Sequence, residues 1–167
     1  MKMEMQELIK LIEQWAIDRG LDKNGTVEGQ LIKTAEEVAE LIIGICKDDI
    51  YVIKDSVGDV FVTLVIGNML DINFDISDIY EIANWGSLMS IRRKYDLIHF
   101  ATQKLYDLTS AERYTKGHVG LIIENLLDVC EWYDLDFTDC VESAYKEIAG
   151  RKGRVIDGTF VKEDDLI

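Results

Sequence analysis

The chain contains no proline, the residue that most strongly interrupts helices. Its 167 residues are instead rich in Leu, Ile, Glu and Lys, which favours helix throughout. Hydrophobic residues make up 48%, a content that argues against disorder at this length. We therefore expect a helical protein with a real core.

Cysteine is scarce, and its spacing suits neither a metal site nor a disulfide framework. Cys46, Cys130 and Cys140 form no CxxC pair, and their odd number excludes complete internal pairing. Each lies in an apolar stretch, so we expect small buried side chains in a reducing compartment. No uncharged run reaches membrane-spanning length, and residues 1–7 lack a signal-peptide core. These absences predict a cytoplasmic protein that does not engage membranes.

Positive charge is also in short supply. The 18 Lys and Arg residues are outnumbered by 32 Asp and Glu residues, which gives a net charge of −14 at pH 7. Such a field repels a polyanion, so we expect no duplex-binding groove and no nucleic-acid partner. A small anion that arrives with a divalent cation remains compatible with this charge.

Apolar residues recur at helical spacing along most of the chain, and no strand-like alternation stands out. Thr26 is the predicted N-cap of a helix that follows a loop at 21–26. The tail from 150 to 167 is expected to be extended or turn-rich, with Val155, Phe160 and Val161 docked. The predicted helices cover about 3–19, 27–47, 50–70, 76–90, 93–108, 117–133 and 139–150.

The predicted fold class is all-α, a helical bundle built as a tandem degenerate repeat of a four-helix unit. Segments beginning at Leu31, Val57 and Asn73 resemble later segments at offsets of 66, 62 and 63 residues. The expected parts are a catalytic half at 1–90, a degenerate repeat at 91–150 that completes the bundle, and a tail at 151–167. Together they are expected to form one compact domain. In the second copy the acids of the first are replaced, as by Thr102, Gln103, Tyr106 and Leu121.

Acidic residues gather on two consecutive predicted helices. Asp59 is the only charge between Val57 and Leu70, and a carboxylate on so apolar a helix needs a partner or a metal. At about 100° per residue, Glu37 lies near Glu40 on one helix face, and Asp55 lies near Asp59 on the next. Antiparallel packing across the turn at 47–49 would bring these four carboxylates together as ligands for Mg²⁺ or Mn²⁺. The alternative is that the glutamates line a solvated face.

These motifs resemble the MazG-like all-α nucleoside triphosphate pyrophosphohydrolases, whose pattern is EExxE, a spacer and then ExxD. The resemblance is strongest over about 27–75, and the tail from 151 to 162 is similar to the ending of phage-type members. It implies Mg²⁺-dependent cleavage of free nucleoside or deoxynucleoside triphosphates to the monophosphate and pyrophosphate. It also implies that Glu37, Glu40 and Asp59 are metal ligands and that Glu36 is the first motif acid. The catalytic set is thus Glu36, Glu37 and Glu40.

One position departs from the family pattern. Ser56 stands where the first acid of ExxD is expected, and Asp55, four residues before Asp59 on the same helix face, is the candidate replacement. In the implied mechanism, the ion lowers the pKa of water and a motif glutamate accepts its proton.

Binding a triphosphate also requires cations. Asn84, Trp15 and Trp85 are candidates for contact with the base, and for the two tryptophans the alternative is packing in the core. For each candidate cation, the alternative is a position on the solvated surface. The candidate cations are Arg92, Arg93, Lys94, Arg151, Lys152 and Arg154.

Two functions remain open at this stage: the enzyme, and a non-catalytic nucleotide- or metal-binding or protein-interaction bundle of the same architecture. The expected state is a monomer or a homo-oligomer, with the second half of each chain forming a wall of the site.

Overall fold

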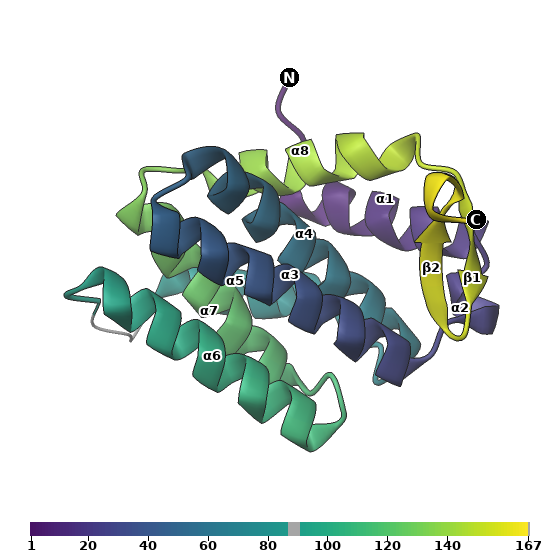
Figure 1. The fold of residues 1–167 in the computed structure, drawn as a ribbon, viewed down its shortest axis with the longest axis horizontal. Coiled ribbons are helices and arrows are strands. Elements are labelled where there is room, and N and C mark those ends of the chain that lie inside the picture. Colours follow the sequence, from purple (N-terminus) through teal and green to yellow (C-terminus); the bar gives the residue numbers. More distant parts are fainter. Residues whose placement is uncertain (87–90, 167) are drawn as a thin grey trace.

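Helices form almost all of the regular structure in the computed structural model, which describes residues 1–86 and 91–166. Figure 1 shows them packed together, with a small hairpin at one end of the molecule. The elements are α1 (Met5–Asp18), α2 (Leu21–Asn24), α3 (Val27–Lys47), α4 (Ile50–Leu70), α5 (Ile76–Trp85), α6 (Lys94–Ala111), α7 (Lys116–Trp132), α8 (Phe137–Ala149), β1 (Gly153–Ile156), β2 (Thr159–Lys162) and the 3-10 helix η1 (Glu163–Asp165). The predicted all-α helical bundle is confirmed.

Helix α4 is the centre of the core. It is apolar on almost every side, and α1, α3, α7 and α8 all pack against it. Val57, Phe61 and Leu64 are among its completely buried residues. Asp49 caps its first turn by accepting hydrogen bonds from the backbone N–H groups of Tyr51 and Val52. The predicted buried helix is therefore confirmed.

The two halves of the chain interlock. Helices α3 and α4 pair, as do α6 and α7, but the third helix of each set crosses over: α8 packs on α4, and α5 packs on α7. A Cβ atom at Gly58 would lie 2.4 Å from the carbonyl oxygen of Cys140 in α8, and one at Gly120 would lie 3.3 Å from Ile79 in α5. Gly58 thus permits the close crossing of α4 and α8, and Gly120 permits the corresponding crossing of α7 and α5.

This exchange of third helices is what a duplicated helical unit would produce, and the duplication itself stays a prediction. Asp75 and Asp136 both act as N-caps, of α5 and α8 respectively. If these two caps are taken as equivalent positions, the offset of the segment that begins at Asn73 becomes 61 residues instead of 63.

Tyr114 joins the second half to the first half of the chain. Its ring lies against Gly67, where a Cβ would come within 2.1 Å of it, and the residue is completely buried. Its hydroxyl is hydrogen-bonded to Thr34 at 2.7 Å, and Thr34 is 2.9 Å from the hydroxyl of Thr63. A polar network inside the core therefore fixes where α6 and α7 meet α3 and α4.

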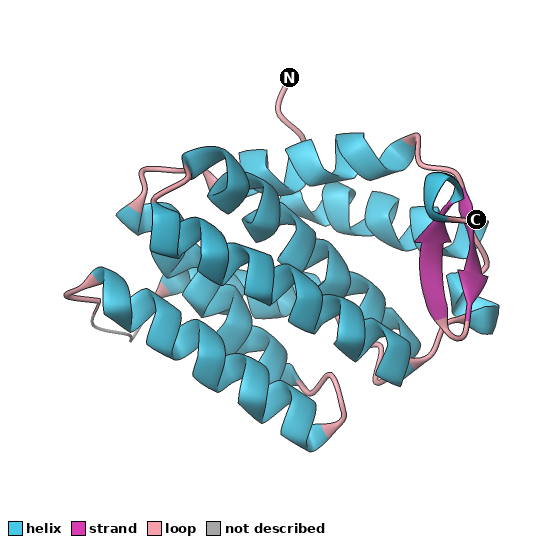
Figure 2. Cartoon of the chain, in the orientation of Figure 1, coloured by secondary structure: helices cyan, strands magenta, loops and turns pink. Residues whose placement is uncertain are grey.

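The C-terminal tail forms a hairpin, drawn in magenta in Figure 2. Asp157 and Gly158 have φ values of 49° and 82°, so they form the two-residue turn that suits paired antiparallel strands. The carbonyl of Gly158 accepts a hydrogen bond from the backbone N–H of Thr26 at 3.1 Å. A Cβ at Gly158 would lie 2.2 Å from the Thr26 hydroxyl, so only glycine fits this contact. Docking of Val155 and Phe160 is confirmed.

Several local predictions need correction. The expected loop at 21–26 contains α2, because Gly20 in the left-handed conformation reverses the chain and Leu21 is buried. The helix predicted over 76–90 ends at Trp85, and residues 87–90 lie outside the described part. Cys46 is exposed rather than buried, because it lies on the outer face of α3. The predicted N-cap Thr26 is confirmed, with its hydroxyl accepting from Gly29 N–H at 3.0 Å.

The described helices include none that is both long enough and apolar enough to cross a membrane.

Candidate functional site

Five acidic residues of α3 and α4 line one cavity of about 470 Å³. The two helices run antiparallel across the turn at Asp48 and Asp49, so the acids of the first helix face those of the second. The acids that the structure brings together here include all those expected from the sequence, namely Glu36, Glu37, Glu40, Asp55 and Asp59.

Asp55, and not Ser56, faces the cavity. Adjacent residues on a helix point about 100° apart, so only one of the two can share the face of Asp59. Asp55 lines the cavity, whereas Ser56 is 2% exposed and does not belong to the lining. Asp55, rather than Ser56, therefore lies beside Asp59 at the cavity.

Glu147 of α8 is an acid that sequence reasoning missed. It lines the same cavity, and its carboxyl lies close enough to that of Asp55 to raise the pKa of Asp55. Gly58 makes this contact feasible, because any side chain there would collide with α8 at Cys140 and Ala144. The available signal was the i, i+4 spacing of Glu147 and Arg151, which form an ion pair at the end of α8.

The backbone at Arg151 is fixed by two side chains, one from α1 and one from the residue that follows it. The backbone carbonyl of Arg151 accepts hydrogen bonds from the Arg19 guanidinium at 2.7 and 3.0 Å. The indole N–H of Trp15 donates to the carbonyl of Ile148 at 2.7 Å. These two side chains complete the C-terminal end of α8 and direct the chain into the hairpin. Arg151 is therefore a positioned cation at the acidic cavity.

The acids at the centre of the cavity have raised pKa values. Burial, together with the charges of Glu37 and Asp55, raises the pKa of Asp59 to about 7, although Arg151 opposes the shift. Burial also raises the pKa of Glu37 against the effect of Lys33, 3.8 Å away. The pKa of Asp55 is raised by burial and by Glu147. Carboxyls in this state bind either protons or a cation.

The donor chemistry suits a hard divalent cation. The candidate ligands are carboxylate oxygens on helices, which Mg²⁺ and Mn²⁺ prefer. Across residues 1–86 and 91–166, however, no three His, Cys, Asp or Glu side chains are gathered closely enough to hold a metal as they stand. A metal would therefore require side-chain rotation within the cavity.

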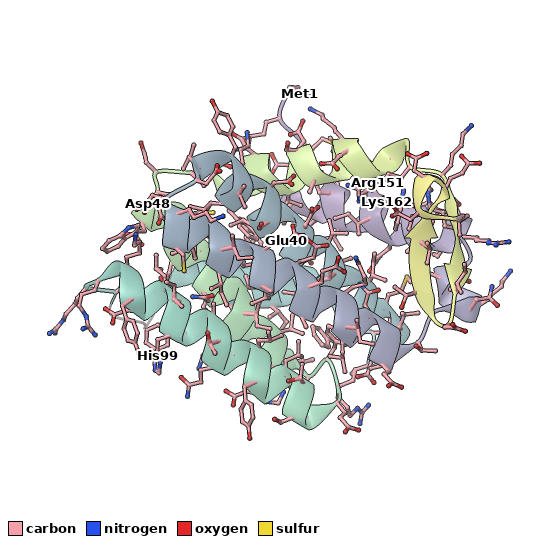
Figure 3. The ribbon with its side chains drawn as sticks, in the orientation of Figure 1. Met1, Glu40, Asp48, His99, Arg151 and Lys162 are labelled. Atoms are coloured by element: carbon pink, nitrogen blue, oxygen red, sulfur yellow. The ribbon has the colours of Figure 1, made fainter. Side chains whose placement is uncertain are left out.

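The cations of the cavity differ from most of those expected. Arg151 lines it as predicted, and Lys33 and Lys162 join it although the sequence did not single them out. Figure 3 shows Glu40, Arg151 and Lys162 near one another, whereas His99 lies well apart. Lys33 could have been found from its i, i+4 spacing to Glu37.

The remaining predicted contacts lie elsewhere. Lys152 and Arg154 are exposed on the hairpin and do not line the cavity, because the strand turns them outward. The backbone N–H of Arg92 donates to Asp96 at the start of α6. Asn84 lines a different pocket, next to α7 and α8.

The other candidate cations and aromatic residues are placed as follows. Arg93 pairs with Asp96, and Lys94 pairs with Asp48 at 2.7 Å, both outside the cavity. Trp85 is 88% exposed, whereas Trp15 is buried and lines the cavity.

Comparison with known proteins gives one informative relative. No protein-family model matches the chain, and no solved structure matches it. The chain is 52% identical over 63 residues to an uncharacterized 18.2 kDa protein in the rep-hol intergenic region of Haemophilus phage HP1. The match covers 38% of this chain and 39% of the phage protein, so it spans less than half of either, and what it shows is similarity to a phage-encoded protein.

Proposed function

We propose that this protein hydrolyses nucleoside or deoxynucleoside triphosphates to the monophosphate and pyrophosphate, with Mg²⁺ or Mn²⁺ as cofactor. The observation that carries the proposal is that Glu37, Asp55 and Glu147 lie around Asp59 in a cavity that also holds Arg151. Carboxyls gathered around one cavity repel one another unless protons or a cation neutralise them; here Asp59 and Glu37 are half-buried, while Asp55 and Glu147 are exposed.

The ligand set would be Glu37, Glu40, Asp55 and Asp59, with Glu147 beside Asp55. A bound ion would neutralise phosphate oxygens and lower the pKa of water. Glu36 lines the cavity but lies outside this set, so it is the motif glutamate left to accept the proton of the attacking water.

The cations have a separate role. The guanidinium of Arg151 can form paired hydrogen bonds with phosphate oxygens, and Lys162 adds a point charge from the hairpin. Together they offset part of the negative charge that the acidic wall presents to a triphosphate. The proposed site therefore combines acids of α3 and α4 with cations from the C-terminal part of the chain.

A second candidate is a non-catalytic module that binds nucleotide or metal without turnover. Two observations favour it: serine at position 56, and the absence of a ready-made metal group among the described residues. Both candidates share the cavity, so only a measurement of turnover separates them.

The test is a panel of ribo- and deoxynucleoside triphosphates incubated with the full chain and Mg²⁺. We expect equal amounts of monophosphate and pyrophosphate from at least one substrate, and complete loss with EDTA. Asp59→Asn should be inactive, and Glu7→Gln, a change of an exposed acid on α1, should retain full activity. Binding without product would favour the module, and release of single phosphate would contradict the proposed bond cleavage.

A further inference from the structure

The cavity continues beyond its acidic end. Along one face of α4 it is lined first by Asp55 and Asp59, then by Val62, Thr63 and Ile66. Eleven residues separate the first from the last of these, a rise of about 16 Å along the helix. The cavity therefore changes from acidic to largely apolar over a length that different parts of one ligand would occupy.

The opposite wall changes in the same direction. Gln30 of α3 lies beside Thr63 and donates from its side-chain amide to the Thr63 carbonyl at 3.3 Å. Strand β2 begins at the same end, because a Cβ at Gly29 would lie 2.7 Å from the hydroxyl of Thr159. The strand ends at Lys162, toward Arg151, as Figure 3 shows. Along α3, α4 and β2 the character of the cavity wall thus changes in the same direction.

The walls around Gln30, Thr63 and Thr159, at the start of β2, carry no charge, whereas Lys162, at the other end of that strand, belongs to the acidic end. An uncharged planar group with polar edges suits these side chains, since the apolar atoms cover its faces and the hydroxyls and amide meet its edges. A phosphate would find no cation here. The side chains in question are Leu21, Gln30, Val62, Thr63, Ile66 and Thr159.

We infer, on the basis of the proposed function, that the cavity binds its substrate lengthwise. The triphosphate and its cation lie at the acidic end near Arg151 and Lys162, and the nucleobase lies between α3, α4 and β2. The hairpin is then the element that selects nucleoside triphosphates over phosphoanhydrides without a base. Val161, which is partly exposed and lines the cavity, is a specificity-determining contact.

The experiment measures binding by calorimetry with Ca²⁺, using each common nucleoside triphosphate and inorganic tripolyphosphate as probes. At least one nucleotide should bind about tenfold or more tightly than tripolyphosphate. Val161→Ala should narrow that difference about threefold or more, a size expected from lost methyl contacts. Thr159→Val, which replaces the hydroxyl by a methyl group of similar size, should narrow it too. Neither variant should change tripolyphosphate binding.

The matched control is Val155→Ala, which makes the same truncation in strand β1 of the same hairpin, away from the cavity lining. It should leave both affinities unchanged. The inference is overturned if tripolyphosphate binds as tightly as every nucleotide, or if Val161→Ala weakens both ligand types equally. Pyrophosphate release together with such a result would leave the proposed function standing. Selective nucleotide binding without release would reject the proposed function and retain the base subsite.

Discussion

Among single residues, Asp59 makes the stability of the metal-free protein depend on pH. Its pKa is raised to about 7 in the folded state, from an ordinary value of 3.8. The folded state therefore holds a proton that the unfolded state has lost, and the free energy of unfolding falls as pH rises from about 4 to 7. The upper limit of this loss is about 4 kcal/mol.

We expect Asp59→Asn to remove most of this pH dependence. In EDTA at pH 8 the variant should melt no lower than the parent chain, because a repelled charge is gone, and it should lose both turnover and the stabilisation that Mg²⁺ confers. Thermal melts from pH 4 to 8, with and without Mg²⁺, measure these effects. Retained activity in this variant would remove Asp59 from the site.

Asp55 and Ser56 allow a second test at the same scale. Because Asp55 lines the cavity and Ser56 is buried away from it, Asp55→Ala should reduce kcat/KM about as much as Glu40→Ala. Ser56→Ala should retain activity. Ser56→Glu restores the family pattern in sequence, yet it places a carboxylate in the core, so we expect its free energy of unfolding to fall by several kcal/mol, about 3 or more.

Steady-state kinetics and urea unfolding of these variants separate the two positions. A large activity defect in Ser56→Ala together with a mild one in Asp55→Ala would reverse the assignment.

Among the elements, the crossing of α4 and α8 sets the position of Glu147. A Cβ at Gly58 would lie 2.4 Å from a backbone oxygen of α8 and 2.7 Å from the side chain of Ala144. Gly58→Ala therefore has to push α8 outward, which should lower stability by about 1 to 3 kcal/mol. It should also raise the Mg²⁺ concentration needed for activity, because Glu147 moves away from Asp55.

Gly117→Ala is the matched control, since a Cβ there meets nothing within 4 Å. Unfolding curves and Mg²⁺ titrations of the two variants test the role of the crossing. Equal behaviour of the two alanine variants would show that close approach of α8 is unimportant for the site.

For the whole molecule, the exchange of third helices makes the halves interdependent. Fragment 1–90 lacks α7 and α8, which cover α4, and so it exposes a large apolar surface. We expect it to be unfolded or self-associated, whereas the full chain binds divalent cations at one class of site. Size-exclusion chromatography, circular dichroism and calorimetry test this. A monomeric, folded and active fragment 1–90, or two equivalent metal sites per chain, would contradict it.

The sequence alone determined the helices, the burial of α4 and the grouping of acids on α3 and α4. These features depend on periodicity and capping within one element or between neighbours, as with Thr26 and the turn before Ile50. That Asp55, rather than Ser56, lines the cavity was also predictable, because the phase of a single helix decides which residue shares the face of Asp59.

Tertiary structure alone decided which distant residues complete the cavity. Glu147 reaches Asp55 only because α8 crosses α4 at Gly58, and Lys162 reaches the cavity because the hairpin turn docks on Thr26. Arg92 and Asn84 carry suitable chemistry but lie elsewhere. Such contacts depend on crossing angles and on the docking of segments about 90 to 130 residues apart, which no local pattern encodes.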